Sequence, residues 1–487
     1  MVEQRGAEPR PGGDRAFRIE QHGIDFIPEA ERWAKPRDLF GMWAGASFNV
    51  EYFVYGVILI TFLGVDFFQA VLVTIVGNLS FLLLGVASLQ GPQTGTTVFT
   101  INRAAFGPNG SRLIAVFNWL TMVGFETEGL ILIVFAAEVL TLKAGFHPGD
   151  PAKVLFVVIG VAIQLLLPLL GHATIVKSLR LLIAPFVVLY CALAALTLGK
   201  TDFHTVRVGA GWETMLAALA FTIVLSGLGW TECGNDFSRY LPPNAKRSAI
   251  VGWVFLGTAV PETLIMLLGI AVGTYTKGAL AGGNPFAAFV TPGVTVFATG
   301  FVVPFLLIAI VQLFAINSLD LYSSGVTLQA IGLRIPRWQA VLIDTTICLA
   351  ITIYAVFNSS FSKLLGDFVA VVVVWIAPWL AIYLTDWLLR GRRYDAAELQ
   401  RTDPASLYYR RGGIFWPGLV AQVVGMLAAF EGLAATFALP RWLHWVNVSL
   451  GGADLSVFLG MAVAALVYVA LGGTAVRAEA EVAAPAA

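Results

Sequence analysis

Several acidic residues, among them Asp344 and Asp367, lie within strongly apolar segments, where an ionisable side chain is costly and is a candidate for binding a ligand or an ion. Glu126 and Glu128 occur in MVGFETEGLIL, and Asp320 occurs in AINSLDLYSSG. On a helix, Glu126 and Glu128 project about 200° apart, so at most one of them can face a common central site. For each acid, a structural ion pair or a position near the membrane interface is the competing interpretation.

Aromatic side chains adjoin these polar residues. Phe125 directly precedes the two glutamates, and Trp43 and Trp230 lie in segments that also carry Ser, Thr, Asn and Glu. A planar heterocycle needs ring faces on which to stack and a few donors and acceptors for its polar edge. These residue types therefore favour binding of a small heterocycle, although many of the 13 tryptophans are expected to anchor the chain at membrane interfaces.

Other kinds of chemistry have little support. The three cysteines show no CxxC or Cys/His ligand spacing and are interpreted as small buried residues. The five histidines are scattered, and no HExxH, GxSxG or phosphate-loop motif is present, which argues against a membrane-embedded enzyme. The formal net charge of zero suggests no nucleic-acid partner. We expect no cofactor, and no metal beyond a possible Na⁺ site.

The composition indicates that lipid is the solvent of this chain. Hydrophobic residues make up 58% of the 487 residues, charged residues only 12%, and the mean hydropathy is +0.80. No compact water-soluble core could hide so much apolar surface. Apolar runs of about 20 residues predict an all-α integral membrane protein with about twelve transmembrane helices. The predicted spans lie near residues 39–63, 66–89, 113–140, 152–170, 180–199, 212–233, 248–274, 294–326, 338–357, 361–389, 414–436 and 455–475.

The distribution of lysine and arginine predicts the orientation. With the N-terminus in the cytoplasm, most of the 30 basic residues fall in cytoplasmic segments. The chain is thus expected to be a multi-pass protein of the cell (inner or plasma) membrane with both termini cytoplasmic. A sensor usually carries an additional signalling domain, whereas the tails here are short.

Two spans carry polar residues and glycines that predict breaks in the helix. The span 39–63 contains FGMWAGASFNVEYF, and the span 212–233 runs into IVLSGLGWTECGNDF. Transporters unwind paired helices in this way, so that freed backbone groups can bind a substrate and an ion. Close helix packing at glycine is the alternative interpretation, and the GxxxG spacing of Gly41 and Gly45 fits it.

The two broken spans lie five spans apart, which predicts two repeats of opposite topology, since an odd number of spans inverts the second copy. The predicted organisation is a cytoplasmic tail (1–38), a first five-helix repeat (39–199), an inverted second repeat (212–389), two accessory helices (414–475) and a cytoplasmic C-terminal tail (476–487). A major-facilitator fold would divide six and six around a central loop, but the longest interior loop, about 390–413, follows the tenth span.

Five stretches carry a resemblance to a known family. They are FGMWAGASFNVEYFVYG, GNLSFLLLGVASLQGPQTGTTVFTINRAAFGPNG, GWTECGNDFSRYLP, INSLDLYSSGVTLQ and YDAAELQRTDPASLYYRRGGIFWPGLVAQVVG, and they spread from about residue 32 to residue 425. On these motifs the chain resembles the nucleobase–cation symporter-1 family, and in particular its purine–cytosine permease branch.

The resemblance implies a leucine-transporter-type fold, in which ten helices form two inverted repeats and two more follow. Members import cytosine, purines, uracil, allantoin, hydantoins and some vitamins, driven by Na⁺ or H⁺. We therefore expect a cation symporter that imports a small heterocycle by alternating access. Its partners would be the substrate and the lipid bilayer, and it would be a monomer or a weak oligomer. The same fold carrying a vitamin-like heterocycle is the alternative.

The resemblance also implies the site residues. The substrate would stack on Phe125 and Trp230, between the first, third, sixth and eighth spans. The expected substrate-binding residues are Asn49, Phe125, Glu126, Gly129, Trp230, Asn317 and Asp320. The expected cation site joins backbone carbonyls near Ala44 and Ser47 to hydroxyls of Ser323 or Ser324. A proton-coupled version would need only a carboxylate such as Asp320.

Overall fold

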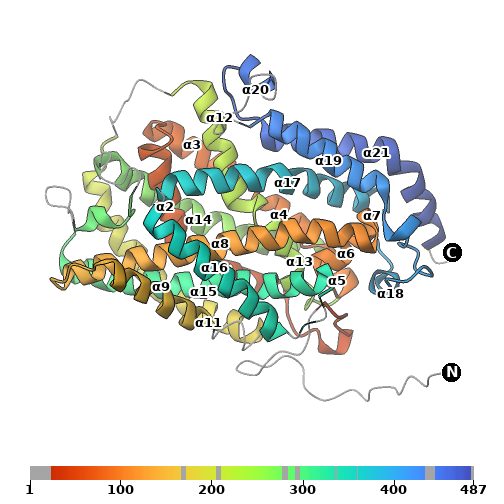
Figure 1. Ribbon diagram of the computed structural model, residues 1–487, viewed down its shortest axis with the longest axis horizontal. Coiled ribbons are helices and arrows are strands. Elements are labelled where there is room, and N and C mark those ends of the chain that lie inside the picture. Colours follow the sequence, from red (N-terminus) through yellow and green to blue (C-terminus); the bar gives the residue numbers. More distant parts are fainter. Residues whose placement is uncertain are drawn as a thin grey trace.

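The computed structural model describes residues 24–165, 172–203, 210–276, 283–290, 297–333, 335, 337–358, 360–433 and 445–483. Over these residues the regular secondary structure is helical throughout (Figure 1). Among them, 10 helices are long and apolar enough to cross a membrane, and a bent pair brings the number of crossings to 11. The chain is therefore an all-α integral membrane protein, as predicted.

The first half of the chain contains α1 (Pro36–Ser47), α2 (Val50–Thr61), α3 (Phe67–Asn78), α4 (Phe81–Ala87), α5 (Gln90–Thr94), α6 (Val98–Ile101), α7 (Arg103–Phe106), α8 (Pro108–Lys143), α9 (Asp150–Gln164) and α11 (His172–Thr197). The second half contains α12 (Trp212–Ile223), a π-helical segment (Val224–Leu228), α13 (Gly234–Ser238), α14 (Arg247–Thr276), α15 (Thr299–Ile331), α16 (Arg337–Asn358), α17 (Phe361–Leu389), α18 (Ala396–Gln400), α19 (Trp416–Glu431), α20 (Trp445–Ser449) and α21 (Ser456–Ala483). Short 3-10 turns occur at Glu29–Glu31, Leu198–Lys200, Thr231–Cys233, Ala287–Phe289 and Arg411–Gly413.

Most predicted spans correspond to a helix or a helix pair. The predicted fourth span, 152–170, corresponds to α9, whose last residue is Gln164, and residues 166–170 lie outside the described part of the chain. Parts of the two predicted tails and of the span 414–436 also lie outside it. The segment predicted as a C-terminal tail, from residue 476, instead continues α21 as a helix to Ala483. Glu479 accounts for this, because it pairs with Arg390 and Arg410 of the helical bundle.

The predicted break in the first span is present. Helix α1 ends at Ser47, α2 begins at Val50, and the two helices are bent by 55°. Asn49 caps α2, since its side-chain oxygen accepts a hydrogen bond from the backbone N–H of Glu51 and so satisfies a donor that the helix start leaves free. Close packing at glycine is present as well, because a Cβ at Gly45 would lie 2.6 Å from the Cβ of Leu179 in α11.

The sixth span is also interrupted. Regular α-helix stops at Ile223, and Ser226 has non-helical backbone angles (φ −97°, ψ −123°). The next residue, Gly227, lies against the turn between α3 and α4, where its N–H donates to the Ser80 hydroxyl at 3.0 Å. A Cβ at Gly227 would lie 2.1 Å from the Ser80 carbonyl carbon. Only glycine therefore allows this approach of two backbones.

Glycines also bring α2 and α14 into backbone contact. A Cβ at Gly56 would lie 2.1 Å from the carbonyl oxygen of Met266, and a Cβ at Gly269 would lie 2.0 Å from that of Phe53. Small residues allow such close packing of helices in lipid. Helices α8 and α15 also pack against each other, and α17 lies beside α8 and α19 (Figure 1). The two interrupted spans are thus held in a closely packed helical frame.

A buried ion-pair network links α17 to α21. The two carboxylate oxygens of Asp386 accept hydrogen bonds from Arg390 Nε at 3.1 and 3.0 Å, and one of them also accepts from the Tyr468 hydroxyl at 2.7 Å. Arg390 donates to Glu479 at 3.1 Å and to the carbonyl oxygen of Ala104 at 3.2 Å. One guanidinium group therefore joins α17, α21 and the segment that precedes α8.

Candidate functional site

The start of α2 carries polar side chains into the interior of the bundle. Asn49, Glu51, Tyr52 and Tyr55 are all buried. Because residues three and four apart lie on one face of a helix, Tyr55 lies beside both Glu51 and Tyr52. Asn49 Nδ2 donates to the Glu51 carboxylate at 3.1 Å, and the rings of Tyr52 and Tyr55 meet edge to face with centroids 5.6 Å apart. One polar, aromatic face of α2, which begins at the break in the first span, therefore points into the interior of the bundle.

Trp230 contacts this face from the interrupted sixth span. Its indole Nε1 donates to the Tyr52 hydroxyl at 3.1 Å. Its ring packs edge-on against Trp43 of α1, with centroids 5.6 Å apart. Trp230 is only partly buried. The hydrogen bond and the ring contact fix the indole, while part of its surface stays open to a ligand.

Phe125 of α8 lies near the same interruption. A Cβ at Gly229 would lie 3.5 Å from the Phe125 ring, and Phe125 itself packs edge to face against Phe368 of α17 with centroids 5.0 Å apart. Phe125 is also only partly buried. Of the two aromatic residues predicted from the sequence, Phe125 thus lies near Gly229 in space, and Trp230 directly follows Gly229 in the chain.

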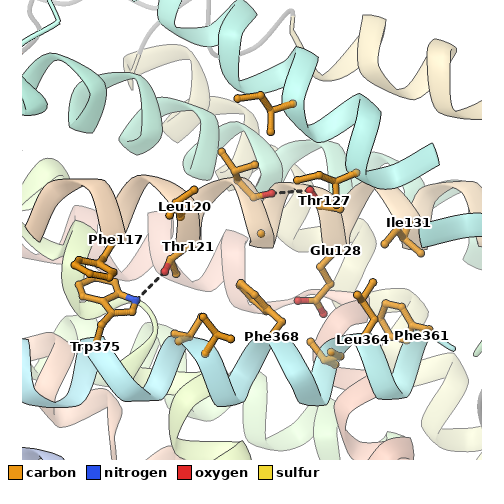
Figure 2. Close-up of a pocket in the computed structure, with 17 residues that line it drawn as sticks. Phe117, Leu120, Thr121, Thr127, Glu128, Ile131, Phe361, Leu364, Phe368 and Trp375 are labelled. Atoms are coloured by element: carbon orange, nitrogen blue, oxygen red, sulfur yellow. Dashed lines mark hydrogen bonds between the residues drawn. The ribbon is translucent and has the colours of Figure 1, made fainter. Parts of the chain in front are cut away.

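A cavity of about 290 Å³ lies between α8, α16 and α17 (Figure 2). Glu128 extends into it from α8, near Phe368 and Leu364 of α17 (Figure 2). One Glu128 oxygen accepts a hydrogen bond from the Tyr55 hydroxyl of α2 at 2.8 Å, and the other has no hydrogen-bond partner among the described residues. Apart from Thr121, Thr127 and Glu128, the lining is apolar. The cavity is thus lined mainly by hydrophobic side chains, with one buried carboxylate among them.

Glu126 faces away from Glu128, as helix geometry predicts. It is fully buried, and its carboxylate oxygens have no hydrogen-bond partner among the residues that the structure describes. Its electrostatic neighbours are Asp344 of α16 and Asp320 of α15. Of the two glutamates, Glu128 is therefore the one that reaches α2 and the aromatic residues.

Asn317 and Gly129 contact each other. Asn317 Nδ2 donates to the backbone oxygen of Glu126 at 3.1 Å and to Gln164 Oε1 of α9 at 3.2 Å. A Cβ at Gly129 would lie 2.2 Å from Asn317 Oδ1, so the glycine makes room for this amide. The amide N–H groups of Asn317 hold α15 against α8 and α9, whereas its Oδ1 has no hydrogen-bond partner among the described residues.

Asp320 belongs to a group of four buried carboxylates that comprises Glu51, Glu126, Glu128 and Asp320. Asp320 is only 4% exposed and interacts electrostatically with the other three. Within the described part of the chain, none of the four forms an ion pair. Buried carboxylates without basic partners are costly unless protons, a cation or donor groups neutralise them. Each of these carboxylates is therefore suited to hold a proton or to accept ring N–H donors, whereas among the described residues no three of them are placed to hold a metal ion together.

Comparison with known proteins assigns the chain to a family. The model of a family described as permeases for cytosine/purines, uracil, thiamine and allantoin matches residues 26–460. The chain belongs to this permease family. It is therefore a multi-pass membrane transporter and not an enzyme, and the resemblance drawn from the sequence motifs is confirmed.

Curated relatives and solved structures agree with this assignment. The permease is 26% identical over 466 residues to YxlA of Bacillus subtilis, whose name places it among the purine-cytosine permeases, covering 93% of this chain and 96% of that protein. It is 25% identical over 470 residues to the purine-cytosine permease fcyB of Emericella nidulans, covering 93% and 88%.

The permease also superimposes on Mhp1, a nucleobase-cation-symport-1 family transporter solved in a closed conformation with bromovinylhydantoin bound. The TM-score is 0.70 at 18% identity, and the match covers 94% of this chain and 96% of that one. This similarity confirms the leucine-transporter-type fold. The division of the permease into inverted repeats at 39–199 and 212–389 stays a prediction.

The predicted cation residues of the permease lie at the end of α1 and in α15. Ser47 and Ser323 are buried. Ser324 donates a hydrogen bond to Asp344 of α16 at 2.5 Å, and the carbonyl oxygen of Ala44 accepts one from the N–H of Phe48 at 3.0 Å. Ser324 and Ala44 thus already have hydrogen-bond partners, and the cation site stays a prediction.

Sequence reasoning missed one buried acid of the permease. Glu262 of α14 is fully buried, is hydrogen-bonded to Ser226 in the interrupted span, and lies beside Tyr52. The signal that singled out Glu126 also applies here, since VPETL places an acid inside an apolar span. Glu232 was noticed only as part of the sixth-span motif. It too is fully buried, and its carboxylate has no hydrogen-bond partner among the described residues.

Proposed function

We propose that the protein is a secondary active transporter, a cation symporter that imports a nucleobase or a related small heterocycle of purine, cytosine, allantoin or hydantoin type by alternating access. The observation that carries this proposal is the convergence of aromatic rings and buried carboxylates at two interrupted spans, in a member of this permease family. The alternative is the same transporter with a vitamin-like heterocycle, because the family description includes thiamine.

In the proposed complex the heterocycle stacks against Phe125 and Trp230. Ring N–H groups donate to Asp320 and Glu128, because ionised carboxylates accept hydrogen bonds and do not donate them. Glu128 takes the part that the sequence assigned to Glu126, since Glu128 receives the hydrogen bond from Tyr55. The cavity beside Glu128 gives room for an apolar substituent on the heterocycle.

Asn49 and Asn317 lie at the edges of the proposed site and hold neighbouring protein groups in place, because their amide N–H groups already donate to protein acceptors. Gly129 leaves space for the Asn317 amide. The coupling ion is Na⁺ or H⁺. A Na⁺ ion would use oxygen ligands near Ser47 and Ser323, whereas a proton would use one of the buried carboxylates.

The membrane arrangement is part of the same proposal. Both termini lie in the cytoplasm, and the protein resides in the cell (inner or plasma) membrane as a monomer or weak oligomer. A bundle of helices rocks against the remaining helices and exposes the central site to one side at a time. The positive-inside distribution of lysine and arginine supports this orientation.

Substitution of Trp230 tests the site. Trp230→Ala is expected to weaken substrate binding by about 10- to 100-fold, because stacking of a base on an aromatic ring is worth about 1–3 kcal/mol. Binding and proteoliposome uptake of radiolabelled cytosine, adenine, hypoxanthine, uracil, allantoin and hydantoin would be measured, with Asp320→Asn in parallel. Trp253→Ala is the matched control, because Trp253 is 38% exposed on α14 and packs against Phe40.

Each outcome of this experiment has a distinct meaning. Unchanged affinity in Trp230→Ala would contradict the stacking site, while the substrate class would stand. Absence of uptake of every heterocycle by folded wild-type protein would contradict the nucleobase assignment and favour a vitamin-like substrate. Loss of binding in Trp253→Ala as well would show that the effect is not specific to the site.

A further inference from the structure

Glu262 lies near the middle of the spanning helix α14, and no basic residue of the described part of the chain pairs with it. Helix α14 runs from Arg247 to Thr276, so at about 1.5 Å per residue Glu262 lies roughly 20 Å from either end. Its side chain is fully buried. Its side chain contacts Ser226, Tyr52 and Asn78, which are all neutral, and its charged neighbour is another acid, Glu51. A charge in such a position is costly unless it binds a proton or a cation.

The helices packed against α14 supply few ionisable groups near Glu262. Helix α2 contributes Tyr52 and Glu51, and α4 contains no ionisable residue. Helix α3 contributes the neutral Asn78. These neighbours include an acid and a phenol but no base, so a proton is the simplest partner for the Glu262 carboxylate.

The charged groups on the remaining neighbours lie farther away. Asp38 of α1 and Arg180 of α11 pair with each other at 3.2 Å. The segment with Lys200 and Asp202 is bound at Thr274 of α14, which is about three helical turns from Glu262. Neither group stands where it could neutralise Glu262 directly.

The hydrogen bonds around Glu262 can be drawn in two ways, which differ in the orientation of the Asn78 amide and in the protonation state of Glu262. With Asn78 Oδ1 toward Ser226, the Ser226 hydroxyl donates to Asn78 at 2.8 Å, and Asn78 Nδ2 donates to the Thr263 hydroxyl at 2.8 Å. A hydroxyl carries one hydrogen, so Ser226 cannot also donate to Glu262. With this amide orientation, a hydrogen bond between Ser226 and Glu262 would need a protonated Glu262 carboxyl group as its donor.

The second arrangement follows from turning the Asn78 amide, which places its oxygen toward donors and its nitrogen toward acceptors. Asn78 nitrogen then donates to Ser226 at 2.8 Å and to Glu262 at 3.1 Å, while its oxygen accepts from the Thr263 hydroxyl at 2.8 Å. The Ser226 hydroxyl is now free to donate to Glu262, which accepts as an ionised carboxylate. The same four side chains therefore satisfy either protonation state of Glu262 by one amide rotation and one hydroxyl rotation.

Glu262 is also connected to the substrate-binding aromatic residue. Ser226 is the residue at which the sixth span loses helical geometry, and Trp230 follows it in the same interruption. Tyr52, which lies beside Glu262, accepts the indole hydrogen bond of Trp230. Glu262 is therefore linked to Trp230 in two ways, through Ser226 and through Tyr52.

We propose that Glu262 is the proton-binding site of this symporter and that Ser226, Asn78 and Tyr52 transmit its protonation state to the interrupted sixth span. This inference rests on the proposed transport function. One proton binds to the Glu262 carboxylate when the site faces outward and leaves when it faces inward, with the substrate carried in the same cycle. The coupling ion is thereby H⁺.

Transport in proteoliposomes tests the coupling. Glu262→Gln keeps the shape and hydrogen-bonding capacity of the neutral acid and cannot release a proton. It is expected to retain substrate exchange between the two sides and to lose accumulation driven by an inward proton gradient. A gradient of about one pH unit supports about tenfold accumulation for one proton per substrate. Glu138→Gln is the control, because Glu138 pairs with Lys153 near the end of α8, and it should accumulate as the wild type does.

A second variant and a second measurement keep the proton site testable without transport. Infrared difference spectra between acid and alkaline pH should show a carboxyl C=O band that is absent in Glu262→Gln and present in Glu138→Gln. Ser226→Ala should keep this band, because the acid remains, and should lose proton-driven accumulation.

Results that contradict the proton site can be distinguished from results that contradict the proposed transport function. Proton-driven accumulation by folded Glu262→Gln, or accumulation by the wild type under a Na⁺ gradient alone, would overturn the proposal. So would an infrared difference spectrum of Glu262→Gln identical to that of the wild type. If the wild type exchanged no heterocycle but kept the band, the proposed function would fail and Glu262 would stand as a proton site only.

Discussion

Replacing Gly227 by alanine is expected to prevent the sixth span from reaching its place against the turn between α3 and α4. An alanine Cβ would lie 2.1 Å from the carbonyl carbon of Ser80 and 2.2 Å from the nitrogen of Phe81. Overpacking a buried site costs about 1–3 kcal/mol even when side chains can adjust. Here the obstacle is backbone, so we expect little folded protein and no substrate binding in what remains.

The yield of monodisperse protein in detergent and its thermal stability would measure this effect. Gly252→Ala is the matched control, because it is also a glycine within a spanning helix but has no atom within 4 Å of an added Cβ. It should be folded and active. If Gly227→Ala folded and bound substrate like the wild type, the close approach of the sixth span to Ser80 would be wrong.

The second large effect is expected for Arg390→Ala. Arg390 is 2% exposed in its side chain and lies between the carboxylates of Asp386 and Glu479. Removing one partner of a buried ion pair costs about 3–5 kcal/mol, because the remaining charge is left buried without compensation. The guanidinium group also donates to Ala104. We expect α21 to detach from α17 at this end and the unfolding temperature to fall markedly.

Thermal unfolding in detergent and proteolysis of α21 would test this expectation. Arg401→Ala serves as the comparison, since Arg401 also pairs with an acid, Glu398, but its side chain is 43% exposed. Exposed pairs of this kind contribute little to stability, so Arg401→Ala should unfold like the wild type. Equal stability of Arg390→Ala and Arg401→Ala would show that the buried network does not hold α21.

Much of the fold could be predicted from the sequence because lipid imposes simple local requirements. Each span needs a long apolar run, and for α14 and α17 the limits predicted from these runs agree closely with the ends of the helices in the structure. The break at Asn49 was also predictable, since Asn is a strong capping residue and comes two residues after the small residues Ala44–Ser47. The helical continuation to Ala483 was not, because it depends on the contact of Glu479 with Arg390.

The candidate site was less predictable because it depends on how each helix is rotated. The spacing of Glu126 and Glu128 shows that only one can face the centre, but α8 is buried on most of its sides, so the apolar pattern does not indicate which one. Two neighbours of Glu262, Ser226 and Asn78, are 36 and 184 residues away from it in the sequence. Such contacts are set by tertiary packing and leave no local signal.

The glycine seam between α2 and α14 has a mechanical consequence. Helices in backbone contact at Gly56 and Gly269 have no side chains between them that could repack and let one slide along the other. The two helices therefore move as one rigid body. Tyr52 and Glu262 both belong to this body, so the distance between them stays constant during the transport cycle. A hydrogen bond that breaks in the cycle must therefore join this body to another part of the protein, as the hydrogen bonds to Ser226 and Trp230 do.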